Sequence, residues 1–255
     1  MNTETHQAIV SRQFSPQARS YFTSAVHAGG EDLDLMARLV GKRPGAIALD
    51  MGCGGGHATF RLAPLVEKVV AYDLSEAMLA VVAEEAKHRG LSNVVTKQGA
   101  AETLTCPSAA FDVAVSRYST HHWLDLPVGL AQMRRVLKTG GLAIFMDVIT
   151  SGSPLLDTWL QTLELLRDPS HVRNYSVTEW QAMLSTAGFK PGAVSLFRLR
   201  LDFSSWISRM NTPEAHVQAI RSLQQRASAD VSGRLAIESD GSFTLDTMLF
   251  RAEAA

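Results

Sequence analysis

The chain has 255 residues, of which 46% are apolar, and its 24 basic and 25 acidic residues give a net charge of −1. This length and apolar content suit one α/β unit whose sheet is buried on both faces. The balanced charge disfavours a nucleic-acid partner, and the two cysteines make no disulfide framework. Neither a membrane-spanning run nor a signal-peptide pattern is found, so a cytoplasmic location is expected.

Two helices are predicted before the first strand. After a polar, frayed start over residues 1–10, a helix is expected over residues 15–22, and apolar positions at helical spacing predict another over residues 31–40. Polar, aromatic and glycine residues are interleaved over residues 21–33. Such a segment either covers a ligand or forms an ordinary surface helix–loop–helix, and both interpretations stay open.

Strands and helices then alternate. Strands are predicted over residues 46–50, 68–73, 94–98, 111–116 and 142–147, with helices after Gly56 and over residues 76–89 and 127–137. Asp125 is the expected N-cap of the third helix, and Gly140-Gly141 follow its end. The alternation predicts a parallel sheet with right-handed crossovers.

The pattern changes after residue 150. Helices are predicted over residues 155–166, 177–188 and 204–226, the last interrupted at Thr212-Pro213, and strands over residues 193–201 and 243–251. Ser176-Val177-Thr178-Glu179 has the form of a capping box, which indicates the start of a helix.

A glycine-rich loop follows the first predicted strand. The apolar run Ile47-Ala48-Leu49 ends in Asp50, and Met51-Gly52-Cys53-Gly54-Gly55-Gly56 follows. Glycines let the backbone turn sharply and let a ligand approach its N–H groups. A carboxylate at the mouth of the loop repels a pyrophosphate. Asp50 therefore favours a ligand that is positive there, such as S-adenosylmethionine (SAM) with its ammonium and sulfonium.

A second acid lies in register with this loop. Asp73 ends the next apolar strand, about 20 residues after the loop, where an acid accepts hydrogen bonds from both hydroxyls of a ribose. Ser75 is the expected N-cap of the helix that follows. The loop and the two acids together predict a nucleoside-binding site.

These motifs resemble those of class I SAM-dependent methyltransferases, and the chain is similar to the small-molecule enzymes of ubiquinone, menaquinone and biotin biosynthesis. The matching motifs are Leu49–Gly56, Tyr72–Ser75, Gly99–Leu104, Phe111–Arg117 and Leu137–Leu142. The resemblance implies a Rossmann-like α/β fold, in which a seven-stranded, mostly parallel sheet has helices on both faces and its last strand antiparallel.

The resemblance also implies an organisation. The whole chain, residues 1–255, would be a single methyltransferase domain with an N-terminal helical lid (1–44), a SAM-binding core (45–150) and a substrate-side half (151–255). Within that half, a helical insertion over about residues 202–235 would lie above the active site.

Several residues are implied to bind the cofactor. Asp50 would hold the ammonium of SAM or else satisfy loop amides, and Asp73 would bind the ribose. Met78 would contact the adenine or pack in the core, and Glu102 would border the adenine or remain a solvated loop acid. The full expected set is Tyr21, His27, Asp50, Gly52, Cys53, Gly54, Asp73, Leu74, Met78, Ala101, Glu102, Arg117 and His122.

Arg117 and two residues of the lid carry further expectations from the resemblance. By the resemblance, the Arg117 backbone would lie beside the methionine part of SAM. Alternatively, its guanidinium would pair with Asp50 or Asp147. Tyr21 and His27 would lie near the methionine carboxylate if their segment folds over the cofactor.

Two adjacent histidines, His121 and His122, follow the fourth predicted strand. Either is a candidate general base, since imidazole takes a proton near neutral pH. Either would otherwise form a pocket wall or pack against the cofactor. Residues 171–175 are a candidate segment for closing the acceptor pocket. No other metal ligands cluster nearby in the sequence, so no metal site is expected.

The implied reaction is direct methyl transfer from SAM to a small-molecule acceptor, with S-adenosylhomocysteine (SAH) as the product. The residues do not reveal whether carbon, nitrogen or oxygen is methylated. A nucleotide-dependent dehydrogenase is disfavoured by Asp50 and by His57, which stands where that fingerprint needs Gly or Ala. A SAM-binding subunit without turnover is the alternative that the motifs leave open, and a homodimer is an open alternative to a monomer.

Overall fold

The computed structural model describes residues 3–19 and 29–255. Across these residues, seven strands lie in the order β3-β2-β1-β4-β5-β8-β7, and a two-residue strand, β6, pairs with β5. The strands are β1 (Arg43–Met51), β2 (Val66–Asp73), β3 (Val94–Gln98), β4 (Phe111–Arg117), β5 (Leu137–Thr150), β6 (Tyr175–Ser176), β7 (Phe189–Leu201) and β8 (Phe243–Ala254).

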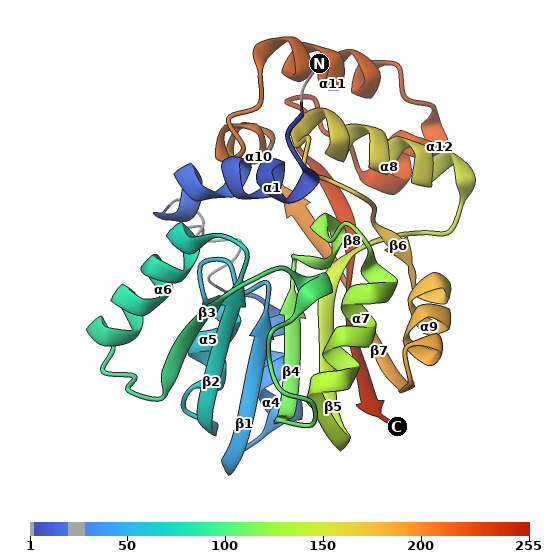
Figure 1. Ribbon diagram of the computed structural model, residues 1–255. Coiled ribbons are helices and arrows are strands. Elements are labelled where there is room, and N and C mark those ends of the chain that lie inside the picture. The colour runs from blue at the N-terminus through green and yellow to red at the C-terminus, as the bar shows by residue number, and fades with distance from the viewer. Residues whose placement is uncertain (1–2, 20–28) are drawn as a thin grey trace.

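The sheet is mostly parallel. Strands β1 to β5 pair in parallel, whereas the last strand, β8, lies between β5 and β7 and is antiparallel to both. Figure 1 shows β8 running opposite to its neighbours, so that the C-terminus lies at the end of the sheet where the parallel strands begin. The predicted topology, with seven main strands and the last one antiparallel, is confirmed.

Helices cover both faces of the sheet, as predicted. They are α1 (His6–Phe14), α4 (Glu31–Val40), α5 (His57–Leu62), α6 (Glu76–His88), α7 (Leu126–Val136), α8 (Pro154–Arg167), α9 (Val177–Thr186), α10 (Phe203–Arg209), α11 (Glu214–Gln225) and α12 (Ala229–Leu235). Apolar side chains of α7 and α9 pack on one face with Phe145 of β5. Those of α4 and α5 pack on the other, against Val69 and Ile144.

The N-terminal prediction was wrong in part. Residues 6–14 form α1 instead of a frayed start, with Thr5 as the N-cap whose hydroxyl accepts the Ala8 N–H. The helix is mostly polar, and contacts far away in the sequence hold it. Gln13 donates to the Met210 carbonyl at 2.8 Å, and Ser15 bonds Ser75 at 2.9 Å. Long-range contacts of this kind leave no local pattern in a sequence.

Local signals elsewhere predicted the helix starts correctly. Asp125 caps α7 by accepting the Val128 N–H at 3.0 Å. Ser176 and Glu179 form both halves of the expected capping box of α9. Strand β5 begins earlier than predicted, at Leu137, because the expected glycine turn falls inside the strand as an irregularity of its pairing with β4.

Four helices gather beyond the carboxyl ends of the parallel strands. Figure 1 shows α8, α10, α11 and α12 there, with α1 crossing between this group and α6. Trp206 of α10, Ile220 of α11 and Leu160 of α8 share one apolar cluster with Phe243 of β8. No helix among the described residues is long and apolar enough to cross a lipid bilayer.

Replacing Leu130 of α7 by Ala should destabilise the fold by about 2–5 kcal/mol, because this fully buried side chain packs in the cluster between α7 and the sheet. Urea unfolding measures this change. Leu196 of β7 is 64% exposed, so Leu196→Ala is the matched control and should change stability by less than about 0.5 kcal/mol. Equal effects of the two substitutions would contradict the packing described.

Candidate functional site

A large cavity opens at the carboxyl ends of β1, β2, β3 and β4. Eleven of the thirteen residues expected at the cofactor line it, namely Asp50, Gly52, Cys53, Gly54, Asp73, Leu74, Met78, Ala101, Glu102, Arg117 and His122. The other two, Tyr21 and His27, lie outside the described residues. The structure thus brings motifs from four separate strand ends to one concave surface.

The glycine loop brings the end of β1 close to the turn that follows β4. Gly52 has a φ of +74°, which favours glycine, and a Cβ placed there would lie 1.9 Å from the Ser119 hydroxyl oxygen. The Ser119 hydroxyl also accepts the Trp123 indole N–H at 3.1 Å. The loop therefore needs glycine at this position for close packing as well as for its turn.

Asp73 ends β2 at the rim of this loop. One carboxylate oxygen accepts the Gly54 N–H at 2.8 Å, and the other accepts the Ser75 N–H at 2.9 Å. Desolvation raises the pKa of Asp73, although these N–H groups oppose the shift. Each oxygen has a lone pair left for a further donor, so the carboxylate is oriented and still able to bind a ligand.

Asp50 is the most confined acid of the cavity, with an exposed fraction of 1%. The Thr59 hydroxyl donates to its Oδ2 at 2.6 Å, whereas its Oδ1 has no hydrogen-bond partner among the described residues. Desolvation raises the pKa of Asp50 to about 6, against the hydrogen bond from Thr59. A positively charged donor at Oδ1 would relieve this burial.

Arg117 pairs with Asp32 of α4 rather than with Asp50 or Asp147, the two partners named as alternatives. Its Nε lies 2.6 Å from Asp32 Oδ2, and its Nη2 lies 3.2 Å from Oδ1. Both side chains are less than 8% exposed. The start of α4 reaches the end of β4, and this contact between distant segments could not be read from local spacing.

Tyr118 is a functional candidate that the expected set missed. Its φ of +50° is a strained conformation for a residue with a side chain, and such strain tends to gather at binding sites. Burial, with the charge of Asp32 nearby, raises the pKa of its hydroxyl to about 12. The signal in the sequence was weak, since an aromatic residue after a strand is common.

His121 forms an ion pair with Asp147 of β5. The ring Nδ1 lies 2.6 Å from Asp147 Oδ1, while Asp147 Oδ2 accepts the Thr120 N–H at 3.0 Å. Burial alone would lower the pKa of His121, but the carboxylate of Asp147 outweighs it and the pKa is raised. This partner, 26 residues away, orients the imidazole.

His122 has a different environment, although it is the next residue. Its Nδ1 lies 3.1 Å from the Ser170 carbonyl oxygen, and its ring meets the Phe14 ring edge-on at 4.8 Å. Burial, together with the neighbouring His121, lowers the pKa of His122 to about 4. His122 is therefore neutral near pH 7 and is a weak base.

A second, smaller cavity adjoins the first. The residues shared by the two cavities are Phe14, Tyr118 and His122. His121 lines only the second cavity, where the other walls come from β5, β7, β8, α8 and α10 as Val148, Glu164, Arg167, Leu199, Leu201, Trp206, Arg209 and Leu245. The two histidines thus face different spaces, with His122 at the junction.

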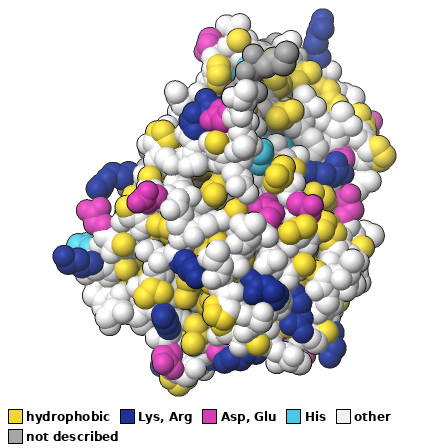
Figure 2. Space-filling model, viewed as in Figure 1, with side chains coloured by type: hydrophobic (Ala, Val, Ile, Leu, Met, Phe, Trp, Pro, Cys, Tyr) yellow, Lys and Arg dark blue, Asp and Glu magenta, His cyan; other side chains and the backbone are white. Residues whose placement is uncertain are grey.

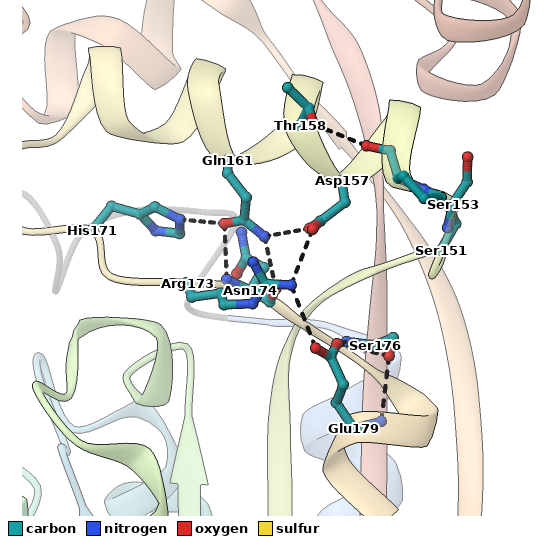
Figure 3. A network of polar contacts seen from close by, with 11 residues as sticks. Ser151, Ser153, Asp157, Thr158, Gln161, His171, Arg173, Asn174, Ser176 and Glu179 are labelled. Atoms are coloured by element: carbon teal, nitrogen blue, oxygen red, sulfur yellow. Dashed lines mark hydrogen bonds and ion pairs between the residues drawn. The ribbon is translucent and has the colours of Figure 1, made fainter.

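A polar network holds the segment between α8 and α9 (Figure 3). Gln161 of α8 bonds the Asn174 backbone in both directions, and its Oε1 lies 2.8 Å from the ring of His171. Arg173 pairs with Asp157 and Glu179. Residues 171–175 were expected to close the acceptor pocket, but they are not among the residues that line either cavity.

Four residues of α1 also line the large cavity, and none of them was expected there. They are His6, Gln7, Val10 and Phe14. The ring Nε2 of His6 lies 3.1 Å from the His122 carbonyl oxygen, which joins α1 to the turn after β4. Among the described residues, no group of three or more His, Cys, Asp or Glu side chains has an arrangement that could hold a metal ion.

The two adjacent histidines should titrate far apart. We expect His121 to have a pKa above 6.5 because of Asp147, and His122 to have a pKa of about 4 because of its burial. NMR of the ring signals over pH measures both values. In the Asp147→Asn variant the pKa of His121 should fall, because the carboxylate that raises it is lost. Two similar titrations near 6.5 would contradict this geometry.

Comparisons with known proteins agree with the site. The family described as "Methyltransferase domain" matches residues 49–145. An uncharacterized protein of Escherichia coli K12, YafE, is 48% identical over 204 residues, covering 80% of this chain and 99% of its own. The uncharacterized methyltransferase YcgJ of Bacillus subtilis is 36% identical over 200 residues, covering 78% and 79%.

More distant relatives and solved structures extend this result. The 2-phytyl-1,4-naphtoquinone methyltransferase of Synechococcus elongatus is 36% identical over 123 residues, which cover 47% of this chain and 53% of its own. The crystal structure of YcgJ covers 87% of this chain and 97% of its own with a TM-score of 0.83 and 32% identity. These named methyltransferases favour an enzyme over a non-catalytic subunit. The chain belongs to the class I SAM-dependent methyltransferases.

Proposed function

We propose that this methyltransferase holds SAM in the large cavity and transfers its methyl group to a small molecule that reaches the junction of the two cavities. The observation that carries this assignment is the unpaired Oδ1 of buried Asp50, which lies beside the glycine loop and in one cavity with Asp73. A ligand with both an ammonium and a ribose matches these two acids.

The loop residues fit the amino-acid end of SAM. Asp50 Oδ1 is buried without a partner, and an ammonium, either directly or through a water, would supply the missing donor. Gly54 has a positive φ angle and open space where a Cβ would lie, so the backbone leaves room for a ligand there. Cys53 is buried in an apolar cluster with Phe60, which supports a packing role for its thiol.

The nucleoside end fits the rim of the cavity. Asp73 would accept hydrogen bonds from both ribose hydroxyls, because its two oxygens are already held apart by backbone N–H groups. Leu74, Met78 and Ala101 would border the adenine, and all three line the cavity. Glu102 also lines it, while its carboxylate accepts the Asp125 N–H at 3.3 Å.

The residues of this chain bind SAM and the acceptor, align them and exclude water. SAM supplies, when bound, a methyl group that its sulfonium makes electrophilic. Holding the two reactants in line contributes roughly 7 kcal/mol or more in favourable intramolecular cases. Phe14, Tyr118 and His122 line both cavities, so they would surround the reacting atoms.

A small acceptor fits the shape and the surface. Residues of α8 and α10 form part of the wall of the second cavity, and about half of its lining side chains are apolar. On the face seen in Figure 2, basic and acidic side chains are interspersed over the described residues rather than gathered in a block of one sign. Such a surface supports a small-molecule partner over a nucleic acid.

The proposal also covers the location and the organisation of the chain. We place the protein in the cytoplasm and treat residues 1–44 as a lid, residues 45–150 as the SAM-binding core and residues 151–255 as the substrate-side half of one domain. A homodimer stays an open alternative to a monomer, which the mass in solution would decide.

Replacing Asp73 by Asn should weaken SAM binding by about 1–3 kcal/mol, because the charge-assisted hydrogen bonds to the ribose are lost. Isothermal titration calorimetry with SAM and SAH measures this change. Asp230→Asn removes an exposed acid from the first turn of α12 and is the matched control. Unchanged affinity in Asp73→Asn would remove the ribose assignment, and no binding of either ligand to the native protein would remove the proposed function.

SAM binding should also depend on pH through Asp50. Its pKa of about 6 means that the carboxyl gains a proton as the pH falls through 6, and the protonated form cannot pair with an ammonium. The affinity for SAM should therefore fall about tenfold from pH 7 to pH 5, since each unit below the pKa costs a factor of ten.

The Asp50→Asn variant provides the control for this pH dependence. Its affinity for SAM should be lower at pH 7 and should lack the step near pH 6, leaving only any loss at lower pH that Asp73 causes. A native affinity that stays constant between pH 7 and pH 5 would contradict the pairing of Asp50 with the ligand.

A further inference from the structure

We propose that the second cavity is the acceptor site, that it takes a flat apolar molecule with a weakly acidic hydroxyl such as a phenol or an enol, and that His121 removes the hydroxyl proton while Asp147 positions the imidazole. This inference rests on the proposed function, since it needs a methyl donor in the first cavity.

The walls of the second cavity suit a flat apolar body. Apolar side chains reach it from four directions: Val148 from β5, Leu199 and Leu201 from β7, Leu245 from β8 and Trp206 from α10. Phe14 and Tyr118 add aromatic surface at the junction with the large cavity. Rings of this kind bind aromatic ligands through stacking and edge contacts.

The position of His121 suits a base that acts on the acceptor. It lines the second cavity and not the first, and its side chain is 16% exposed, so the acceptor can touch it. Because Nδ1 is engaged by Asp147, Nε2 is the ring nitrogen that remains for a ligand. A proton on Nδ1 makes Nε2 the basic lone pair.

Asp147 is the positioning residue. Its carboxylate is held by three backbone and side-chain donors, namely the N–H groups of Thr120 and Val148 and the Thr120 hydroxyl. It is 2% exposed and touches neither cavity. It therefore acts through His121, by fixing the tautomer and by stabilising the imidazolium that forms when the proton arrives.

The groups around His121 make it a stronger base than His122. Acids face it from β5 (Asp147), from α8 (Glu164) and from the turn after α8 (Asp168), and two histidines adjoin it, His122 at 4.1 Å and His171 at 5.8 Å between ring centroids. The acids raise its pKa against the effect of burial. Since only the neutral ring accepts a proton, the rate should rise with pH through this pKa.

A neutral acidic hydroxyl fits this cavity better than a cationic amine. Its lining acid, Glu164, lies 3.5 Å from the guanidinium of Arg167, which also lines the cavity and stacks over Trp206 at 5.0 Å. Asp147 is already paired with His121. A bound ammonium would meet the guanidinium groups of Arg167 and Arg209, whereas a hydroxyl can donate its proton to the neutral ring of His121.

The acceptor hydroxyl proton passes to Nε2 of His121, and a lone pair of the acceptor forms a bond to the methyl carbon. The bond from that carbon to sulfur breaks, its electron pair stays on sulfur, and SAH is the second product. His121 then returns the proton to solvent.

The test uses three naphthalene probes: 1-naphthol, 1-naphthylmethylamine, whose amine is protonated at neutral pH, and naphthalene itself, which has no polar group. They are titrated into the SAH-saturated protein, and methyl transfer from radiolabelled SAM is measured for the first two. We expect 1-naphthol to bind and to be methylated at least tenfold faster than the amine. In the native protein, kcat for 1-naphthol should rise with pH at the value that NMR gives for His121.

Variants separate the base from the pocket. His121→Asn should bind SAH and 1-naphthol within about threefold of the native affinity but lose about 100-fold or more in kcat, the usual contribution of a general base. With 4-nitro-1-naphthol, which is already ionised at neutral pH and needs no base, the loss of kcat in His121→Asn should nearly vanish. Asp147→Asn should lower both the rate and the pKa in the pH profile, and His88→Asn, a change at an exposed histidine, should change neither.

Several results would overturn this inference while leaving the proposed function intact. If SAH binds but 1-naphthol does not, the cavity is not the acceptor site. If the amine is methylated faster, or if the native pH profile does not follow His121, the base and the acceptor class are wrong. That profile needs no variant, so it decides the question even if His121→Asn fails to fold. Failure of SAH to bind would instead overturn the proposed function.

Discussion

Burying the Asp50 carboxylate with one oxygen unpaired costs free energy that the Thr59 hydroxyl offsets only in part, and an unmade hydrogen bond of a charged group costs about 1–3 kcal/mol or more. The chain accepts this cost at the end of β1, beside the glycine loop. In the proposed function, the ammonium of SAM supplies the missing hydrogen bond. The pH dependence that we expect for SAM binding and the preference for a cationic ligand both follow from this one unpaired oxygen.

The turn after β4 links that cavity to a second one. The pKa values of two adjacent histidines shift in opposite directions there. His121 contacts a carboxylate, while His122 contacts a backbone carbonyl and an aromatic ring. Tyr118, which precedes both histidines and has a φ of +50°, lines both cavities. The difference in pKa between these two identical side chains is therefore set by their partners, which come from β5, from the segment after α8 and from α1.

The sequence predicted those parts of the site that depend on local pattern. Asp50 and Asp73 end apolar strands, so their places at one sheet edge follow from parallel pairing. The helix starts at Asp125 and Ser176 follow from capping chemistry. By contrast, α1 was missed because distant contacts hold a polar helix in place.

Pairs of residues that lie far apart in the sequence could also not be predicted from it. Asp32 pairs with Arg117 across 85 residues, and Asp147 pairs with His121 across 26, so spacing in the sequence does not indicate either pair.

A crystal structure of the complex with SAH would test the proposed site most directly. We predict the SAH ammonium, or a water bound to it, on Asp50 Oδ1, both ribose hydroxyls on Asp73, and the sulfur facing Phe14, Tyr118 and His122. SAH bound elsewhere, or bound with Asp50 still unpaired, would contradict it.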